Sequence, residues 1–345
     1  MKKIISIVLL FIIIIAAFAG WKIFGPSIAT SHGDYIYIKT GENFEGVKDS
    51  LVSQNYISSP GWFDKTAKLI GFTPDKLKAG KYKVNKGMSL FNLLRMLKNG
   101  KQTPVNFVIT KLRTKEEFAR KAGNLFECDS AEVINFLNNI DTLKKYDLDT
   151  SNVMSIVIPD TYTYFWNTTP EKIFKKIYDN SLKFWTEERK KKAAEHGLNP
   201  TQAYTLASII EEESNSKEDK PKIASVYLNR IEKGMPLQAD PTIKFAMRDF
   251  GLKRIYEKYL QIESPYNTYR NKGLPPGPIC TPSPGTIDEV LNSPKTDYLY
   301  FVAKSDLAGG SVFTSNYADH MKYAKEYQQA LNKLDSNNKA KQSSQ

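Results

Sequence analysis

The chain has 345 residues, of which 41% are hydrophobic and 12% aromatic, so it is long enough for two folded domains and does not have the composition of a disordered protein. Its net charge of +12 suits an anionic partner, which could be nucleic acid, an anionic lipid surface or a wall polymer carrying carboxylates. Two cysteines, Cys128 and Cys280, are too few for a disulfide framework. We interpret them as separate buried thiols, although they could pair in an oxidising compartment.

The N-terminus carries an almost unbroken apolar run from Ile4 to Trp21, preceded by two lysines. This run is long enough to cross a bilayer. The positive-inside rule then predicts a cytoplasmic tail over 1–3, a transmembrane anchor over 4–24 and export of the remainder. A cleavable signal peptide is the alternative, because Ala17-Phe18-Ala19 has the form of a cleavage site. In both cases the folded part is extracytoplasmic, which argues against nucleic acid as the partner.

A short motif occurs twice in the region that follows. Each copy is a glycine-containing tetrapeptide whose third residue, Asn43 or Ser89, can cap a helix, and apolar residues then recur at three- and four-residue steps. The two copies are Gly41–Phe44 with Val47 and Leu51, and Gly87–Leu90 with Leu93 and Leu97; strand-like segments at 35–38 and 81–84 precede them. The repeat predicts a small α+β module over 34–101.

The remainder of the chain is predicted to be mostly helical. The expected elements are a helix from Pro170 to Gly197 that buries Ile173, Ile177, Leu182 and Trp185, helices over 201–213 and 219–234, a strand over 298–303 and a closing helix after Asp319. Residues 334–345 are polar and are predicted to be disordered.

The histidines and cysteines give no sign of a metal site. His32, His196 and His320 are scattered, without the spacing of a zinc-binding motif, so we expect neither a metal nor another cofactor. Cys280 and His320 could in principle form a nucleophilic pair, but no neighbouring residue supports it. The chemistry is therefore expected from oxygen groups.

Three consecutive glutamates, Glu211 to Glu213, close an otherwise apolar helix. Carboxylates at a helix C-terminus oppose the helix dipole, so their placement needs an explanation, the simplest being a solvated helix end. Helix periodicity places Glu213 on the apolar face and Glu211 beside it, while Glu212 points away. Apolar neighbours disfavour the ionised form of a carboxyl group and suit it to deliver a proton at neutral pH. Periodicity thus favours Glu213 or Glu211 as an acid.

Several motifs of the second half occur in an order and spacing typical of one enzyme family. They are Leu206–Glu211, Ile223–Ile231, Met235–Thr242, Tyr266–Tyr269 and Gly273–Ile279, together with Pro159–Tyr162, Tyr298–Ala303 and His320. This part of the chain, about 200–320, resembles the endolytic murein transglycosylases of the YceG-like (MltG) family. The 34–101 module is similar to the LysM-like subdomain of that family.

The resemblance implies a lyase that cleaves the β-1,4 bond between N-acetylmuramic acid and N-acetylglucosamine and leaves a 1,6-anhydromuramic end. Matched by position, the catalytic glutamate is Glu211, and Glu213 is a supporting residue. The other candidate substrate-binding or supporting residues are Tyr227, Asn229, Arg230, Gln238, Asp240, Tyr266, Asn267, Thr268 and Tyr269. Their amides, hydroxyls and charges suit sugars, but each could instead brace the fold; Arg230 could also pair with Asp240 or with a stem-peptide carboxylate.

Three positions depart from the commoner family pattern. Lys111-Leu112-Arg113 stands where an acidic residue and glycine are more frequent, Thr281-Pro282-Ser283 where asparagine and glycine are, and Ser311 where histidine is. Contacts that those positions make in relatives are not expected here, and none of the three is expected to touch the Glu211 motif.

These features predict an α+β fold with a single N-terminal transmembrane helix, a LysM-like subdomain and a helix-rich catalytic domain with a short sheet over 105–333. The expected partners are peptidoglycan strands, the cell membrane and, from the resemblance, wall-synthesising penicillin-binding proteins whose nascent strands the enzyme would terminate. Two alternatives stay open: a hydrolytic muramidase with Asp240 or Glu213 as second carboxylate, and a non-catalytic peptidoglycan-binding scaffold.

Overall fold

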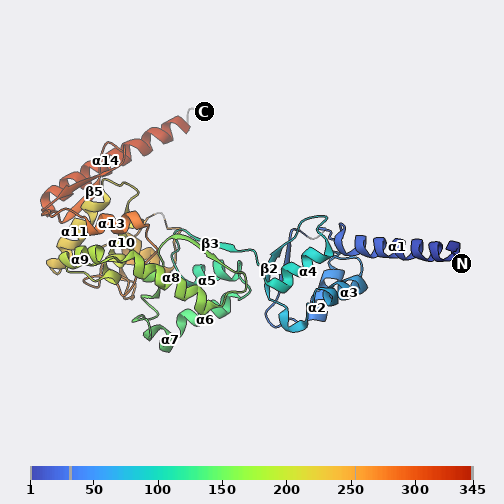
Figure 1. The fold of residues 1–345 in the computed structure, drawn as a ribbon. Coiled ribbons are helices and arrows are strands. Elements are labelled where there is room, and N and C mark those ends of the chain that lie inside the picture. The colour runs from blue at the N-terminus through green and yellow to red at the C-terminus, as the bar shows by residue number, and fades with distance from the viewer. Residues whose placement is uncertain (1, 31–32, 253, 343–345) are drawn as a thin grey trace. The chain divides into compact units, whose positions relative to one another are not determined.

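A computed structural model describes residues 2–30, 33–252 and 254–342. Within them the chain is mostly helical, with small two-stranded sheets, as predicted (Figure 1). It divides into an N-terminal unit and a C-terminal unit. The N-terminal unit comprises residues 1–107, 122–129 and 163–170, and the C-terminal unit comprises 108–121, 130–162 and 171–345.

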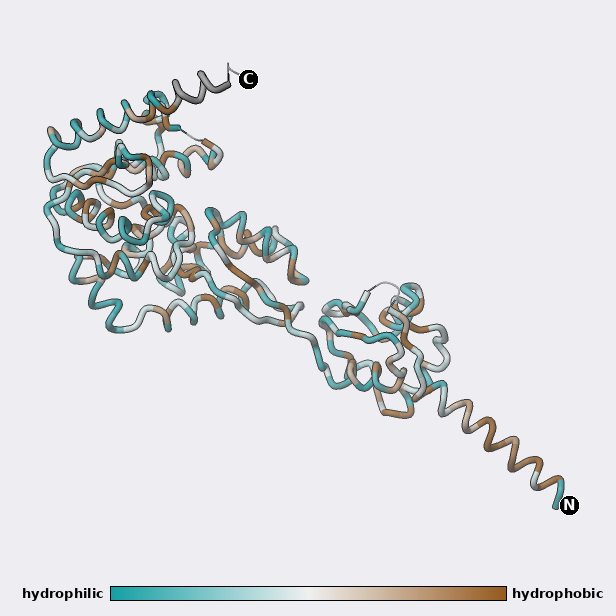
Figure 2. The backbone as a smooth tube through the Cα atoms, turned by 90° about the horizontal axis from the view of Figure 1, so that it is seen from above, coloured by the Kyte–Doolittle hydropathy of each residue, from teal (hydrophilic) through white to brown (hydrophobic). Residues whose placement is uncertain are grey.

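The first element is the apolar helix α1 (Lys2–Phe24), of which no residue is buried. Figure 2 shows the hydrophobic colouring along its length. By length and composition α1 can cross a membrane, and a signal sequence would pass the same test. His32 lies outside the described residues.

The repeat of the sequence folds into two capped helices, which accompany a two-stranded antiparallel sheet. The side chain of Asn43 accepts a hydrogen bond from Gly46 N, and that of Ser89 accepts one from Asn92 N, so both predicted caps are confirmed. The elements of this region are β1 (Tyr35–Ile38), α2 (Phe44–Ser53), α3 (Pro60–Leu69), a 3-10 turn η1 (Pro74–Lys76), β2 (Gly80–Lys83) and α4 (Leu90–Asn99). Strands β1 and β2 are antiparallel with Tyr35 opposite Lys83, and the helices cover a core that includes Phe63, Tyr82 and Leu93.

Strand β3 (Val105–Ile109) pairs with β4 (Asp160–Tyr164), and the boundary between the two units falls inside both strands. The segments 122–129 and 163–170 belong to the N-terminal unit, although they follow the predicted start of the catalytic domain at residue 105. Cys128 is buried in the N-terminal unit and Cys280 in the C-terminal unit.

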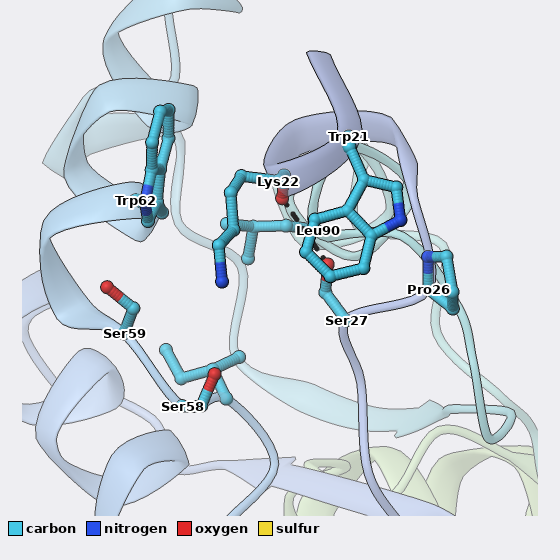
Figure 3. Close-up of a pocket in the computed structure, with 9 residues that line it drawn as sticks. Trp21, Lys22, Pro26, Ser27, Ser58, Ser59, Trp62 and Leu90 are labelled. Carbon is cyan, nitrogen blue, oxygen red and sulfur yellow. Dashed lines mark hydrogen bonds between the residues drawn. The ribbon is translucent and has the colours of Figure 1, made fainter. Parts of the chain in front are cut away.

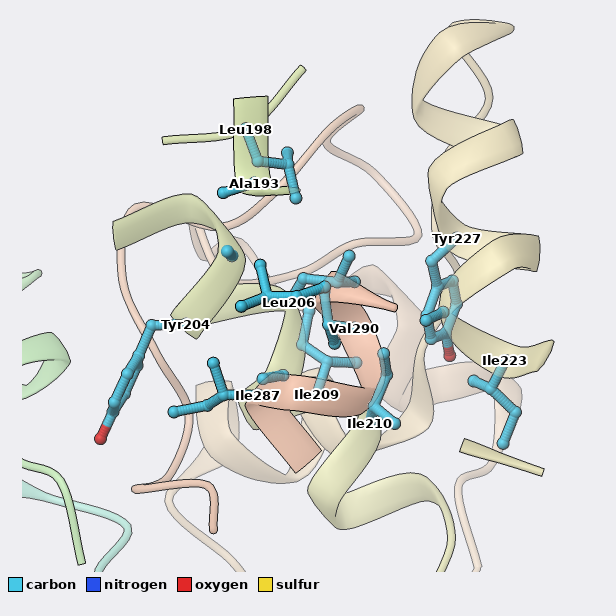
Figure 4. Packing of buried hydrophobic residues seen from close by; sticks show 14 of the residues in the cluster. Ala193, Leu198, Tyr204, Leu206, Ile209, Ile210, Ile223, Tyr227, Ile287 and Val290 are labelled. Atoms are coloured by element: carbon cyan, nitrogen blue, oxygen red, sulfur yellow. The ribbon is translucent and has the colours of Figure 1, made fainter. Parts of the chain in front are cut away.

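The C-terminal unit is built around α10 (Pro200–Glu213), whose residues 203–210 are all buried. Leu206, Ile209 and Ile210 pack in one cluster with side chains of α11 (Lys220–Glu232) and α13 (Pro284–Leu291) (Figure 4). The remaining elements are α5 (Lys115–Gly123), α6 (Ser130–Asn138), α7 (Ile140–Lys144), η2 (Val153–Ile156), α8 (Pro170–Phe184), α9 (Glu187–Glu195), α11 (Lys220–Glu232), α12 (Asp240–Met247), η3 (Glu257–Gln261), α13 (Pro284–Leu291), β5 (Tyr300–Ala303), β6 (Ser311–Thr314) and α14 (Tyr317–Gln342).

The expectation of one long helix before α10 was wrong. The helix predicted from Pro170 to Gly197 is interrupted, because Thr186 accepts a hydrogen bond from Arg189 N and thereby caps a new helix, α9. Leu182, expected in the core, is exposed, whereas Trp185 at the break is buried. Helix α14 is assigned to Gln342, within the tail 334–345 that the sequence predicts to be disordered.

Candidate active site

The glutamate triplet stands at the last turn of α10, a helix fixed at both ends. Asn199 and Gln202 form a reciprocal capping box at its N-terminus. Along the helix, the hydroxyl of buried Tyr204 donates to Val157 O at 2.6 Å. The chain becomes extended at Ser214. The three carboxyl groups are therefore presented in different directions from a rigid scaffold.

Glu211 is held through one of its two carboxylate oxygens. Oε2 accepts hydrogen bonds from Lys220 Nζ at 2.9 Å, from Thr286 Oγ1 and from Ser283 Oγ at 3.4 Å. The side chains of Glu211 and Lys220 are 16% and 11% exposed, so this ion pair is largely shielded from water. Among the described residues, Oε1 has no hydrogen-bond partner. The carboxyl group is thus fixed in direction while one oxygen stays available.

The donors around Glu211 come from the start of two helices. Lys220 is the first residue of α11, and Ser283 and Thr286 belong to the cap and first turn of α13, where Ser283 Oγ accepts from Thr286 N. Lys220 Nζ also contacts Thr286 Oγ1 at 2.6 Å. Glu289, one turn further along α13, carries an Oε2 that is buried without a hydrogen-bond partner in the described part of the chain. Burial raises the pKa of Glu289, and the ammonium group of Lys220 opposes this.

Glu213 has an environment of the opposite kind. Burial raises its pKa from 4.5 to about 7; the hydrogen bond from Tyr227 Oη at 2.7 Å lowers it, and the negative charge of Asp240 raises it further. Tyr227 is itself fully buried in the middle of α11, which raises the pKa of its phenol. A carboxyl group with a pKa near 7 can take up and release a proton at neutral pH. The periodicity of α10, which placed Glu213 on the apolar face, agrees with this.

Glu212, which periodicity places away from the apolar face, does not extend into solvent. Its carboxylate pairs with Lys111 Nζ at 2.9 Å and with Arg113 Nη2 at 3.1 Å, and its side chain is only 16% exposed. Burial raises the pKa of Glu212, but the hydrogen bonds from Lys111 and Arg113 outweigh it and the net pKa is lowered. Glu212 is therefore an ionised anchor between the end of α10 and the segment after β3.

Two of the three departures from the family pattern lie beside the triplet, and the expectation that none would touch the Glu211 motif was wrong. Lys111 and Arg113 bind Glu212, and Ser283 donates to Glu211. These contacts join residues 72 and 99 positions apart. The third departure, Ser311, begins strand β6.

Asn229 and Arg230 use their donors on the backbone. Asn229 Nδ2 donates to the carbonyl oxygens of Thr296 and Tyr298, both at 2.9 Å. Arg230 is buried and donates from Nε to Leu299 O and from Nη1 to Leu237 O, and burial lowers its pKa. The proposed pair of Arg230 with Asp240 is not among these bonds. Both residues hold the segment that leads into β5, which is a supporting role.

The Tyr266–Tyr269 motif also supports the fold. Asn267 is fully buried, and its amide donates to Leu260 O and Ile262 O. Thr268 Oγ1 accepts from Ala239 N and contacts Thr242 Oγ1, so it fixes the chain at the start of α12. Tyr266 packs on Phe245 at a ring distance of 4.6 Å.

Gln238, Asp240 and Tyr269 are the motif residues that keep polar groups at the surface. Gln238 is exposed and has a φ of 54°, a left-handed conformation that is uncommon outside glycine. Exposed Asp240 accepts from Tyr269 Oη at 2.6 Å, and burial followed by this bond raises the pKa of Tyr269. The negative charge of Asp240 raises the pKa of Glu213. Of the candidate substrate-binding residues, Gln238, Asp240 and Tyr269 offer surface polar groups of the kind that bind sugar hydroxyls.

The hollows of the molecule do not by themselves mark the site. A cavity of about 90 Å³ adjoins Glu212 and is lined also by Arg113, Pro241, Lys244, Phe250 and Ile279. Ligand pockets usually measure about 300–1,000 Å³, so this cavity is too small for a sugar. Hollows of about 670 and 570 Å³ lie elsewhere, one along 83–104 and one beside α11 and 294–296. The carboxyl groups, not a cavity, define the candidate site.

Comparison with known proteins gives the family. The YceG-like family matches residues 36–326, which include the repeat at 41–97 and the motifs from Pro159 to His320. The chain belongs to the YceG-like family. A relative from Bacillus subtilis (strain 168), named endolytic murein transglycosylase, is 34% identical over 313 residues, which are 85% of this chain and 84% of the relative.

Other members agree with this assignment. An endolytic murein transglycosylase of Streptococcus pneumoniae (strain ATCC BAA-255 / R6) is 30% identical over 317 residues. That match covers 82% of this chain, which spans only 56% of the pneumococcal protein. The crystal structure of a YceG-like protein, lmo1499 of Listeria monocytogenes, matches with a TM-score of 0.55 and 26% identity, over 84% of this chain and 97% of that one. The YceG-like fold is thus shared over most of the chain.

The YceG-like motifs found in the sequence did not include all of the residues around Glu211. Lys220, Thr286 and Glu289 were not predicted, although Lys220 is the basic residue at the start of the helix that follows the triplet. A buried lysine nine residues after a candidate acid could have been noted as its partner. Thr286 and Glu289 carry no such local signal.

Proposed function

We propose that this chain is a peptidoglycan lyase, an endolytic murein transglycosylase, with Glu211 as its catalytic acid and base. The observation that carries the proposal is the one-sided attachment of Glu211. Three donors hold Oε2 at the end of a rigid buried helix, so the carboxyl group is fixed in direction and Oε1 is left free for proton transfer. The relatives named endolytic murein transglycosylases support the substrate class.

The reaction would proceed in two proton transfers on the same carboxyl group. First, protonated Glu211 delivers its proton to the oxygen of the β-1,4 bond as the bond from C1 of N-acetylmuramic acid breaks, and N-acetylglucosamine leaves with a hydroxyl group. Then the Glu211 carboxylate accepts the proton of the C6 hydroxyl as O6 bonds to C1. The products are a free sugar end and a 1,6-anhydromuramic end. Glu211 regains its proton and no water is consumed.

Within this proposal, Lys220 and Thr286 are positioning residues. Their hydrogen bonds fix the carboxyl plane of Glu211, and the ammonium group of Lys220 stabilises negative charge on it between the two steps. Glu213, with a pKa of about 7, is a second carboxyl group that can exchange a proton, and Tyr227 donates a hydrogen bond to it. Glu213 also favours one alternative, a hydrolytic muramidase, in which this carboxyl group would activate water.

The location of the enzyme follows from α1. We propose that α1 is retained as a single-pass anchor, so that the catalytic unit lies on the extracytoplasmic side of the cell membrane. There it would meet glycan strands as wall-synthesising penicillin-binding proteins produce them, and cleavage would terminate nascent strands. These partners are proposed from the family resemblance, and no cofactor is required.

The test is digestion of intact peptidoglycan by the full-length chain in detergent, compared with Glu211→Gln. We expect the wild type to release muropeptides with 1,6-anhydro ends, each lighter by one water than the hydrolytic product. Products carrying that water would instead establish the muramidase. Full cleavage by Glu211→Gln would refute the assignment of the acid. Binding of glycan without cleavage by the wild type would indicate the scaffold.

A further inference from the structure

The last turns of α1 are packed against the module that follows, and are not joined to it by a free linker. The rings of Phe18 and Trp62 lie 6.2 Å apart, and those of Phe24 and Phe91 lie 5.0 Å apart, so α1 touches both α3 and α4. Both pairs are aromatic contacts between the helix and the folded module.

The segment after α1 is bound along its length. Ser27 N and Ile28 N donate to Met88 O, Gly87 N donates to Ile28 O, and Ala29 N donates to Tyr56 O. The side chain of Ile28 is buried in the core of the module. The C-terminal end of α1 is therefore part of the surface of the module. Where α1 emerges from a membrane, the module lies directly beside it.

Cations and aromatic rings alternate on that surface. Lys22 Nζ lies 5.6 Å from the ring of Phe18 and 5.2 Å from that of Trp21, and Lys65 Nζ lies 4.8 Å from the ring of Trp62. Trp21 is 57% exposed. Tryptophan is enriched at membrane–water interfaces, and lysine extends its charge from an apolar stem toward headgroups.

A pocket of about 160 Å³ opens where α1 meets α3 (Figure 3). The Lys22 side chain extends into it between Trp21 and Trp62, toward the hydroxyl groups of Ser58 and Ser59. No acidic residue lines this pocket, and among the described residues Lys22 forms no ion pair. An uncompensated ammonium group between two indole rings and two hydroxyl groups suits a phosphate ester that carries an apolar chain.

The length of α1 sets the level of this pocket. At about 1.5 Å per residue, the apolar run from Ile4 to Trp21 is about 27 Å long. The hydrocarbon core of a bilayer is about 30 Å thick. When Lys2 and Lys3 lie at one interface, Trp21 and Lys22 lie at the other, and the pocket is at the depth of the headgroups.

We propose that the junction of α1 with α3 binds the headgroup of an anionic phospholipid and holds the N-terminal module on the extracytoplasmic face of the cell membrane. Lys22 contacts the phosphate, Trp21 and Trp62 lie at the interface, and Lys65 contacts neighbouring anionic lipids. This inference goes beyond the enzymatic proposal and shares with it only the retention of α1. Glycan binding at the same surface is an outcome that the test separates.

The test uses the full-length chain in vesicles of phosphatidylcholine, with and without phosphatidylglycerol, and in detergent. A membrane-impermeant amine-acylating reagent is applied briefly, and mass spectrometry follows the modification of Lys22, Lys65 and the exposed control Lys39. We expect phosphatidylglycerol to slow the modification of Lys22 and Lys65 about fivefold, because each favourable charge contact with an anionic lipid has about that effect on the fraction of free amine. The rate of modification of Lys39 should not change. In Lys22→Gln, modification of Lys65 should return toward its rate in phosphatidylcholine; Lys65→Gln should act likewise on Lys22.

Three results would overturn the proposal. Modification of Lys22 and Lys65 at equal rates in both kinds of vesicle would exclude a specific contact with anionic lipid. Protection by soluble peptidoglycan fragments in detergent, without protection by vesicles, would assign the surface to glycan. A mature membrane-derived protein lacking Phe18 would show that α1 is removed. None of these results bears on cleavage by Glu211, which the digestion assay measures separately.

Discussion

Glu211 and Glu213 stand two residues apart at the end of α10, but the groups around their carboxyls differ in kind. Glu211 accepts from an ammonium group and two hydroxyl groups, all through Oε2. Glu213 is bound by a single phenol, that of Tyr227, in a buried environment that raises its pKa to about 7. One helix thus presents a firmly positioned carboxylate and a carboxyl group that titrates near neutrality.

Helix α10 sets the direction of each carboxyl group, and the residues of neighbouring elements set its hydrogen bonding and pKa. The start of α11 and the first turn of α13 provide the donors for Glu211, whereas the middle of α11 provides Tyr227 for Glu213. A catalyst that acts first as an acid and then as a base needs a fixed direction toward one bond, which favours Glu211. A group that merely exchanges protons with its surroundings needs a pKa near the working pH, which Glu213 has.

The largest expected effect is that of Glu211→Gln. Removing a general acid–base group costs about 10²–10⁴ in rate, so kcat should fall by that factor while glycan binding persists. The matched change Glu213→Gln, which preserves shape at the neighbouring position, should reduce kcat about tenfold or less. Initial rates of anhydromuropeptide release, with circular dichroism to verify folding, measure both. Should Glu213→Gln be the inactive variant, the roles of the two residues would be reversed.

The second effect concerns stability and pH. Because the pKa of Glu213 is raised from 4.5 to about 7, the folded protein holds a proton there that the unfolded chain releases between these values. The stabilising contribution is therefore complete below pH 4.5 and is lost as pH rises through 7, by at most about 3 kcal/mol. Urea unfolding of wild type and Glu213→Gln from pH 4 to 8 measures the difference between them. A difference that does not change with pH would contradict the raised pKa.

Local patterns in the sequence predicted much of this scaffold. Asn43 and Ser89 cap helices, and the apolar period of α10 identified the helix with its face against the core. Periodicity alone also places Glu213 against that core. These features depend on neighbours within about one helical turn, so the sequence carries them directly.

The partners of the triplet could not be predicted in the same way. Thr286 lies 75 residues from Glu211, and Arg113 lies 99 residues from Glu212, so both contacts depend on how the helices pack. For that reason helix periodicity gave the direction of Glu212 but not its ion pairs with Lys111 and Arg113. The break at Thr186 was missed because a threonine in a lysine-rich run is compatible both with a helix interior and with a cap.

The third prediction tests the anchoring of Glu211. Lys220→Met removes the ammonium group that holds Oε2, so the carboxyl group loses its fixed direction and kcat should fall about 10–100-fold with little change in KM. Lys220→Arg, which preserves the charge, should recover part of the rate, whereas a purely structural lysine would give no such recovery in kcat. Steady-state kinetics on soluble glycan strands measure the two constants. Equal changes in kcat and KM for both variants would argue against positioning.

The smallest expected effect is that of Tyr227→Phe on the other carboxyl group. Its hydroxyl lowers the pKa of Glu213, so its loss should raise that pKa further and move the pH-dependent loss of stability toward higher pH. Removing one hydrogen bond to a partly ionised group should cost about 1 kcal/mol of unfolding free energy above pH 7, where Glu213 is charged. Below pH 4.5 Glu213 is neutral and its hydrogen bond from Tyr227 is weaker, so the loss of unfolding free energy in Tyr227→Phe should be smaller. Tyr269→Phe, which removes a hydroxyl bound to exposed Asp240, is the matched control. An identical pH dependence in both variants would show that Tyr227 does not set the titration of Glu213, and the contrast with Glu211 would then rest on burial alone.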